Sequence, residues 1–291
     1  MAQFAPGLNL DGPIYALPVV VGTVVPFYNR NALDSAGVAP NDGSWTWDTF
    51  FDIARRVRFM EAGEVLRFGV GGSVMGTFNA LVASHGGRLL SEDRSQPVMN
   101  NEIVLNALET LADLKAENVF GGTFTSGSNV FHIAGDWDPG WWSELPFAWD
   151  IMEMPKGPKG GFTTAWSNGI GIPKGLPEER IELAWEFIKL YVMNPDRKGL
   201  PDIYLYMMPA YIPLAVSEPY LFAEPTMNRR LIVEMHMNNL IQVELTPNFV
   251  EWHDRLLGGL VNQAVNGEIP PSNALVQAEE LIRERGLLAT R

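Results

Sequence analysis

The chain has 291 residues, of which 46% are hydrophobic and 19% charged, a balance that provides enough apolar mass for one large globular unit or two smaller ones. Its formal net charge of −13 argues against nucleic acid or an anionic membrane as partner, because both are bound by basic surfaces. The absence of cysteine excludes disulfides, thiolate nucleophiles and cysteine-ligated metal sites.

The N-terminal segment, MAQFAPGLNLDGP, has no basic region followed by an apolar run, so we expect no signal peptide in this chain. The most apolar stretch, residues 14–27, is interrupted by Pro18 and Pro26 and is too short to span a bilayer. We therefore expect a soluble protein.

The first elements expected from the sequence alternate between strands and helices. Residues 14–29 are rich in Val, Ile and Tyr and predict two short buried strands joined by a bend. Residues 43–59 predict a helix capped by Ser44 or Thr46. Residues 68–72 then predict a strand, and residues 78–87 a helix that ends at a glycine pair.

The clearest amphipathic helix is expected over residues 100–119, with one apolar side formed by Ile103, Ala107, Leu108, Leu111 and Leu114. Beyond it, the pattern predicts strands over 131–137 and 166–175 and helices over 177–192, 226–239, 249–266 and 273–285. The alternation of strands and helices indicates an α/β protein.

Familiar catalytic and metal-binding patterns do not match this sequence. The four histidines lack metal-ligand spacing, and the glycines of residues 69–76 fit neither a dinucleotide fingerprint nor a phosphate-binding loop. A carboxylate pair for glycoside hydrolysis remains an alternative, with the candidates Asp136, Asp138, Glu144 and Asp150.

The segment GDWDPGWWSEL, residues 135–145, places Trp137, Trp141 and Trp142 among carboxylates. An indole face offers apolar stacking area to a sugar ring, and carboxylates accept hydrogen bonds from hydroxyl groups. The segment therefore predicts binding of a carbohydrate or another polyol, with a cation held over the rings as the second possibility. We expect Trp137 to face the ligand and one of the other two indoles to pack on the core.

The order of several segments resembles the family-1 extracellular solute-binding proteins of ABC importers. The matching segments are DGPIYALPVVVGTVVPFYNRNALDSAGV (11–38), SWTWDTFFDIARRV (44–57), FNALVASHGGRLL (78–90), FTSGSNVFHIAGDW (124–137), GFTTAWSNGIGIPKG (161–175), ELAWEFIKLYVMNPD (182–196) and PAYIPLAV (209–216). No single motif is specific, but their order is. The resemblance covers nearly the whole chain.

The resemblance implies an α/β, periplasmic-binding-protein-like (type II) fold with two lobes and a hinged cleft. The ligand-binding positions that it implies are Trp137, Asp136, Asp138, Phe78, Trp166, Ser167, Asn168, Trp252 and Tyr211. The hinge positions that it implies are Val21, Gly22, Thr23 and Gly169.

Members of that family begin with a longer first-lobe segment than this chain contains, so the resemblance implies an incomplete first lobe. We expect a nearly complete second lobe from residues 23–168 plus 240–291, and a first-lobe remnant from residues 1–22 plus 170–239. The helices 177–192 and 226–239 would then expose apolar faces. A fragment or mis-started reading frame, a partner chain that completes the lobe, and dimerisation through the open face are the alternatives.

The function implied by the resemblance is that of a substrate-binding component, not an enzyme, which needs no cofactor or metal. It would bind a sugar or oligosaccharide, deliver it to ABC permease subunits and act in the periplasm or as an extracellular membrane-associated protein. The alternatives are a binder of another small solute (a polyol phosphate, a polyamine or a peptide) and a carbohydrate-active enzyme. Few basic residues lie near the cleft motifs, which argues against a phosphorylated ligand.

Overall fold

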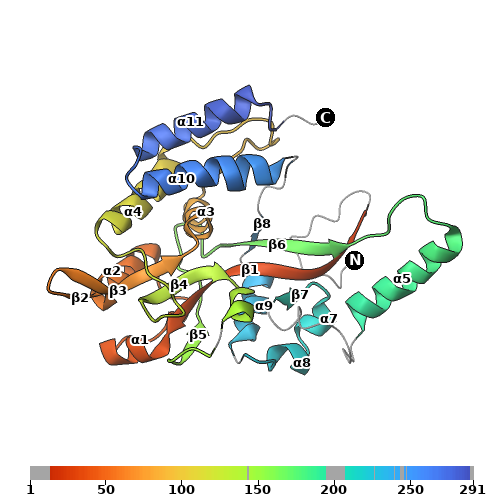
Figure 1. The fold of residues 1–291 in the computed structure, drawn as a ribbon, viewed down its shortest axis with the longest axis horizontal. Helices are drawn as coiled ribbons and strands as arrows, with labels where there is room; N and C mark the ends of the chain where they lie inside the picture. Colours follow the sequence, from red (N-terminus) through yellow and green to blue (C-terminus); the bar gives the residue numbers. More distant parts are fainter. Residues whose placement is uncertain are drawn as a thin grey trace.

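The computed structural model describes residues 14–142, 144–194, 207–225, 227–238, 240–242, 246 and 248–288. Within these residues eight strands join one mixed sheet in the order β2-β3-β4-β1-β6-β8, with β5 and β7 also paired to β1 (Figure 1). The strands are β1 (Leu17–Asn29), β2 (Phe59–Glu61), β3 (Glu64–Gly72), β4 (Asn129–Gly135), β5 (Trp149–Ile151), β6 (Thr163–Ile170), β7 (Met208–Pro209) and β8 (Leu240–Gln242).

Helices surround this sheet on more than one side. They are α1 (Arg30–Ala36), α2 (Trp47–Val57), α3 (Val74–Ser84), α4 (Glu102–Ala116), the 3-10 turn η1 (Asp138–Trp141), α5 (Glu178–Met193), α7 (Ile212–Ala215), α8 (Glu218–Leu221), α9 (Arg229–Asn238), the π-helical η2 (Val250–Leu257), α10 (Gly258–Val265) and α11 (Pro271–Glu284). In Figure 1, α3, α4, α10 and α11 gather on one side of β1, and α7, α8 and α9 lie on the other.

The long strand β1 organises the molecule, and it is one strand rather than the two that the sequence predicted. All of its side chains after Leu17 are buried, so continuous burial outweighs the two prolines. A register shift between Pro18 and Val20 accommodates the first proline without ending the strand.

Different partners flank the two halves of β1. Its first half pairs with β6 on one edge, from Leu17↔Ile170 to Thr23↔Ala165, and with β7 on the other. Its second half pairs with β4, from Val24↔Gly135 to Tyr28↔Phe131, and with β5. Because every pairing of β1 is antiparallel while β3–β4 and β6–β8 are parallel, the sheet is mixed and the fold is α/β.

The expected helices form, with local differences that packing explains. Thr46 is the cap of α2, since its side chain accepts a hydrogen bond from the Thr49 amide. Ile103 was expected on the apolar side of α4 but is exposed, whereas the other four predicted positions are buried. The single helix expected over 249–266 divides into η2 and α10.

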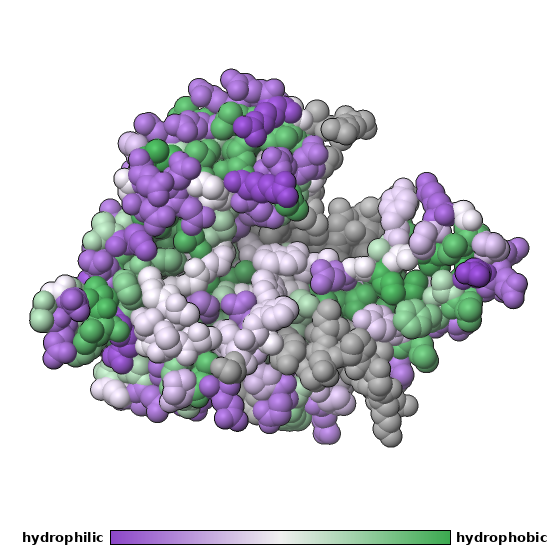
Figure 2. Space-filling model, in the orientation of Figure 1, coloured by the Kyte–Doolittle hydropathy of each residue, from purple (hydrophilic) through white to green (hydrophobic). Residues whose placement is uncertain are grey.

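The two helices expected to expose apolar faces differ from each other. The expectation is wrong for α9, because Leu231, Ile232 and Met235 are buried in the main core. It is confirmed for α5, where Leu183 is 72% and Phe187 is 55% exposed. Figure 2 shows the apolar surface of this helix at the edge of the molecule.

The core under α5 is small. It consists of the buried residues Val19, Val20, Ile188 and Val192, with a few partly buried neighbours. Apart from Leu214, the other buried apolar side chains of the described residues form one continuous cluster around β1, β4, α2, α4, α9 and α10. Among the described helices, none is long and apolar enough to cross a membrane.

Candidate ligand-binding site

Two indoles from distant parts of the chain meet at the middle of β1. Trp137 follows β4 and is half-buried, and Trp166 lies on β6 with 40% of its surface exposed. Their ring centroids are 4.8 Å apart, and the ring planes are tilted by 51°. The structure thus brings together two of the tryptophans that were expected to be ligand-binding residues.

The strand register explains why these indoles meet. Trp166 on β6 lies directly opposite Gly22 on β1. On the other edge of β1, the Asp136 amide donates to the Thr23 carbonyl oxygen at 2.8 Å, which fixes the start of the tryptophan loop. The two rings therefore approach from opposite edges of β1 and contact each other at Gly22.

Asp136 was expected to accept hydrogen bonds from a ligand, and its position contradicts that role. The side chain is fully buried, and its Oδ1 accepts a hydrogen bond from the Thr23 amide at 3.0 Å. Burial raises the pKa of this carboxyl well above its ordinary value, and the amides of Thr23 and Met208 and the Arg229 charge oppose that shift. Asp136 therefore joins the end of β4 to β1 and is closed off from solutes.

Polar side chains remain accessible around the indole pair. Because side chains alternate along a strand, Trp166 and Asn168 share one face of β6, and both are exposed. Ser167 is half-buried on the opposite face. Asp138 is partly exposed, with its Oδ2 3.6 Å from His132 Nε2, a neighbour that no spacing pattern in the sequence indicated.

The other two tryptophans of the loop have different environments. Trp141 is 83% exposed. Trp142 packs edge-on against Phe27, with centroids 4.9 Å apart, and against Trp149 at 5.1 Å. The expectation that one of these two indoles packs on the core is confirmed, and it is Trp142.

Two predicted stacking residues lie in the core instead. Phe78 and Trp252 are almost completely buried, so the prediction that they stack on a ligand is wrong for this conformation. The Trp252 Nε1 group donates to Thr246 Oγ1 at 2.7 Å, which satisfies its polar edge inside the protein. Tyr211 is half-buried at the start of α7, directly after the strand β7 that pairs with β1.

The predicted hinge positions lie on neighbouring strands. Val21, Gly22 and Thr23 pair with residues 167, 166 and 165 of β6, and Gly169 pairs with Pro18. Val21, Gly22 and Thr23 lie just before the point in β1 where its partners change from β6 and β7 to β4 and β5.

Three of the four carboxylates considered for hydrolysis have different surroundings. Asp136 is buried, Asp138 lies near His132, and Asp150 accepts from Arg30 Nη2 at 3.2 Å and from the Asn228 amide at 2.7 Å. No group of three His, Asp or Glu side chains positioned for a metal ion occurs among the described residues.

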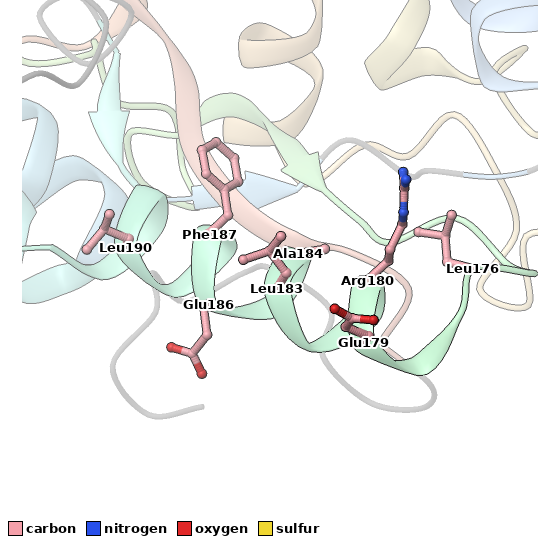
Figure 3. A pocket seen from close by; sticks show the side chains of 8 residues that line it. All are labelled: Leu176, Glu179, Arg180, Leu183, Ala184, Glu186, Phe187 and Leu190. Atoms are coloured by element: carbon pink, nitrogen blue, oxygen red, sulfur yellow. The ribbon is translucent and has the colours of Figure 1, made fainter.

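A separate open groove of about 960 Å³ runs along α5 (Figure 3). Its lining combines the apolar side chains Leu183, Phe187 and Leu190 with Glu179 and Glu186. This groove does not include the indole pair. Figure 2 also shows the surface hollowed between the α10–α11 layer and α5.

The family and curated relatives similar to this chain are binding proteins. A family model described as "Bacterial extracellular solute-binding protein" matches residues 1–199. The arabinooligosaccharide-binding protein of Bacillus subtilis is 24% identical over 202 residues, which cover 61% of this chain. The same match covers 44% of that protein, so the chain spans less than half of the curated relative's length.

Solved structures share the fold over nearly the whole chain. An ABC substrate-binding protein from Listeria monocytogenes in complex with cycloalternan has a TM-score of 0.82 and 23% identity, covering 98% of this chain and 76% of that one. UgpB from Mycobacterium tuberculosis in complex with glycerophosphocholine has a TM-score of 0.78 and 17% identity, covering 98% and 76%. These likenesses confirm the expected type II periplasmic-binding-protein-like fold.

Proposed function

The chain belongs to the bacterial extracellular solute-binding proteins, and we propose that it is the substrate-binding component of an ABC importer for a sugar or oligosaccharide. The observation that carries this proposal is the pair of accessible indoles, Trp137 and Trp166, at the middle of β1. Tilted aromatic faces stack on the apolar faces of pyranose or furanose rings.

Neutral polar groups beside the pair support a hydroxylated ligand. Asn168 is exposed on the same strand face as Trp166, and an amide both donates to and accepts from hydroxyl groups. Asp138 adds a partly exposed carboxylate after β4. Cycloalternan, which is bound in one structural relative, and the arabinooligosaccharide bound by the Bacillus relative belong to this class.

A phosphate-containing solute is the second candidate. It is favoured by the likeness to a protein bound to glycerophosphocholine. Trp137 and Trp166 could hold a quaternary ammonium group by cation–π attraction. Polyamines and peptides are further alternatives from the sequence.

We propose the lobes as the sequence divides them, with residues 23–168 plus 240–291 forming one and residues 1–22 plus 170–239 the other. Residues 1–13, 143, 195–206, 226, 239, 243–245, 247 and 289–291 of this division lie outside the described residues. The strands β1 and β6 would then connect the lobes, and Val21, Gly22, Thr23 and Gly169 would allow closure on a ligand.

The partners are also proposals. Permease subunits would read the closed form, outside the cytoplasm as the family description implies. The groove on α5 would be covered by further polypeptide, supplied by a partner chain or a second copy. Exposed Leu183, Phe187 and Leu190 support such a contact because monomeric proteins seldom leave a contiguous patch of this kind in water.

A ligand panel read by thermal unfolding tests the function. The panel contains an arabinooligosaccharide, cycloalternan and maltotriose, with glycerophosphocholine and spermidine representing the other classes. A true ligand at about one hundred times its dissociation constant raises the unfolding free energy by roughly 2.7 kcal/mol, or the melting temperature by roughly 5–10 °C.

Intrinsic fluorescence and product analysis complete the panel. We expect a sugar to change the tryptophan emission with no product formed on long incubation. If only glycerophosphocholine or only spermidine stabilised the protein, the ligand would belong to the phosphate-containing solutes or to the polyamines, respectively, and not to the sugars. Cleavage of the sugar would contradict the role of a binding protein.

A further inference from the structure

Gly22 lies where a side chain would collide with Trp137. A Cβ atom at this position would lie 2.6 Å from Cζ3 and 2.8 Å from Cε3 of that indole, both well inside van der Waals contact. Gly22 is not one of the glycines with a positive backbone φ. The reason for glycine at this position is therefore the close approach of the indole and not an unusual turn.

Gly135 makes the same kind of contact from β4. A Cβ atom there would lie 2.1 Å from both Cε2 and Cζ2 of Trp137. The two glycines are on adjacent strands, since Gly135 pairs with Val24, two residues beyond Gly22. Both face the six-membered ring of the indole, Gly22 at its Cε3–Cζ3 edge and Gly135 at the opposite Cε2–Cζ2 edge.

We propose that Gly22 and Gly135 are positioning residues that together form a seat for the Trp137 indole and hold it against Trp166. Trp166 is the strand partner of Gly22, so a bulkier residue at Gly22 would push Trp137 away from the ring that it contacts. The consequence for ligand binding rests on the proposed function, whereas the ring geometry does not.

Circular dichroism detects the seat without any ligand, because two indoles in close contact couple their transitions and give a paired positive and negative band. Trp142 and Trp149, 5.1 Å apart, contribute a second coupled pair. The contribution of Trp137 and Trp166 is therefore isolated as the wild-type spectrum minus that of Trp166→Phe.

The test variant is Gly22→Ala, and the matched control is Gly259→Ala, where an added Cβ meets nothing within 4 Å. We expect the wild-type spectrum minus that of Gly22→Ala to show the same band pair as the wild-type spectrum minus that of Trp166→Phe. The spectrum of Gly259→Ala should equal that of the wild type. Retention of the full band pair in Gly22→Ala would overturn the proposed seat.

A stability cycle keeps the test decisive if Gly22→Ala folds poorly. In a Trp137→Ala background the colliding ring is absent, so adding Gly22→Ala should lower the melting temperature much less than it does in the wild type. An equal loss in both backgrounds would contradict the seat, because the cost would then come from the strand itself.

Binding separates this inference from the proposed function. With an equimolar mixture of maltotriose, cycloalternan and an arabinooligosaccharide as probe, we expect Gly22→Ala to weaken the response by about tenfold. If Gly22→Ala loses the band pair but responds fully to the sugars, the proposed seat is supported, and the indole pair is contradicted as the sugar site.

Discussion

At the scale of single residues, Asp136 connects two strands through its carboxylate. It accepts from the Thr23 amide at 3.0 Å in a fully buried position. Asp136→Ala would leave that amide without its acceptor, so we expect the unfolding free energy to fall by about 1–3 kcal/mol. Asp136→Asn keeps an acceptor oxygen, so it should cost less, as measured by denaturant unfolding.

The ligand response distinguishes this structural role from direct contact. We expect Asp136→Asn to bind sugar as the wild type does. A variant of unchanged stability that no longer responds to sugar would place Asp136 in contact with the ligand.

His236 on α9 gives the protein a dependence on pH. Its ring is buried, and burial lowers its pKa from 6.5 to about 4. Between those values the unfolded chain binds a proton that the folded protein does not, so stability is full above pH 6.5 and falls as the pH drops toward 4. The loss should reach roughly 3 kcal/mol at the lower end.

The comparison with His236→Phe measures this effect. The difference in unfolding free energy between the wild type and the variant should change steadily between pH 6.5 and 4, with the variant gaining relative stability. Asp136 has a raised pKa and contributes the opposite slope, but it is present in both proteins and cancels. Parallel curves would show that His236 is not buried in its neutral form.

The sequence predicted some of these residues better than others, for physical reasons. Chemical type marked Trp137, since indoles in a polar, glycine-containing segment are poorly suited to a core, whereas Trp166 was expected only from the family resemblance. The burial of Phe78, Trp252 and Asp136 depends on which face of an element turns inward, and a motif in one dimension does not specify that. The contact between the indoles depends on the β1–β6 register.

At the scale of elements, most helices could be predicted from apolar periodicity and capping residues, as in α2 and α4. The continuity of β1 could not, because prolines usually interrupt strands and only the pairing on both edges overcomes them. The burial of α9 was also missed, since part of its cover comes from β1, which is distant in sequence.

The helix α5 yields a prediction at this scale. Leu183 and Phe187 are one turn apart on its exposed apolar face and line the groove. We expect the isolated wild type to self-associate and to bind an apolar dye. The double variant Leu183→Ser, Phe187→Ser should show less self-association and less dye binding, with little change in melting temperature. Light scattering and dye fluorescence measure these effects.

Phe222→Ser provides the matched control, because Phe222 is 74% exposed at the end of α8 and lies away from the groove lining. It should leave self-association unchanged. A wild type that is monomeric at high concentration and binds no dye would contradict the proposed cover over α5.

At the scale of the whole molecule, β1 is the element on which both the fold and the proposed function depend. Its apolar residues from Val21 on contribute to the main core, while Val19 and Val20 belong to the small core under α5. The strand has one set of partners up to residue 23 and another from residue 24. The indole pair lies at this change of partners, so motion between the two parts of the molecule would alter the environment of the rings. The proposed hinge residues and the proposed stacking residues therefore lie next to each other, since Gly22 pairs with Trp166 and contacts Trp137.

The proposed sugar site at the indole pair is tested most directly by comparing how far a ligand stabilises the variants Trp166→Ala and Trp141→Ala. Both changes remove one exposed indole, but only Trp166 contacts Trp137 among the described ring contacts. With the sugar that stabilises the wild type, we predict that Trp166→Ala loses most of the rise in melting temperature and Trp141→Ala keeps it. An equal rise in both variants would contradict a sugar site at the indole pair.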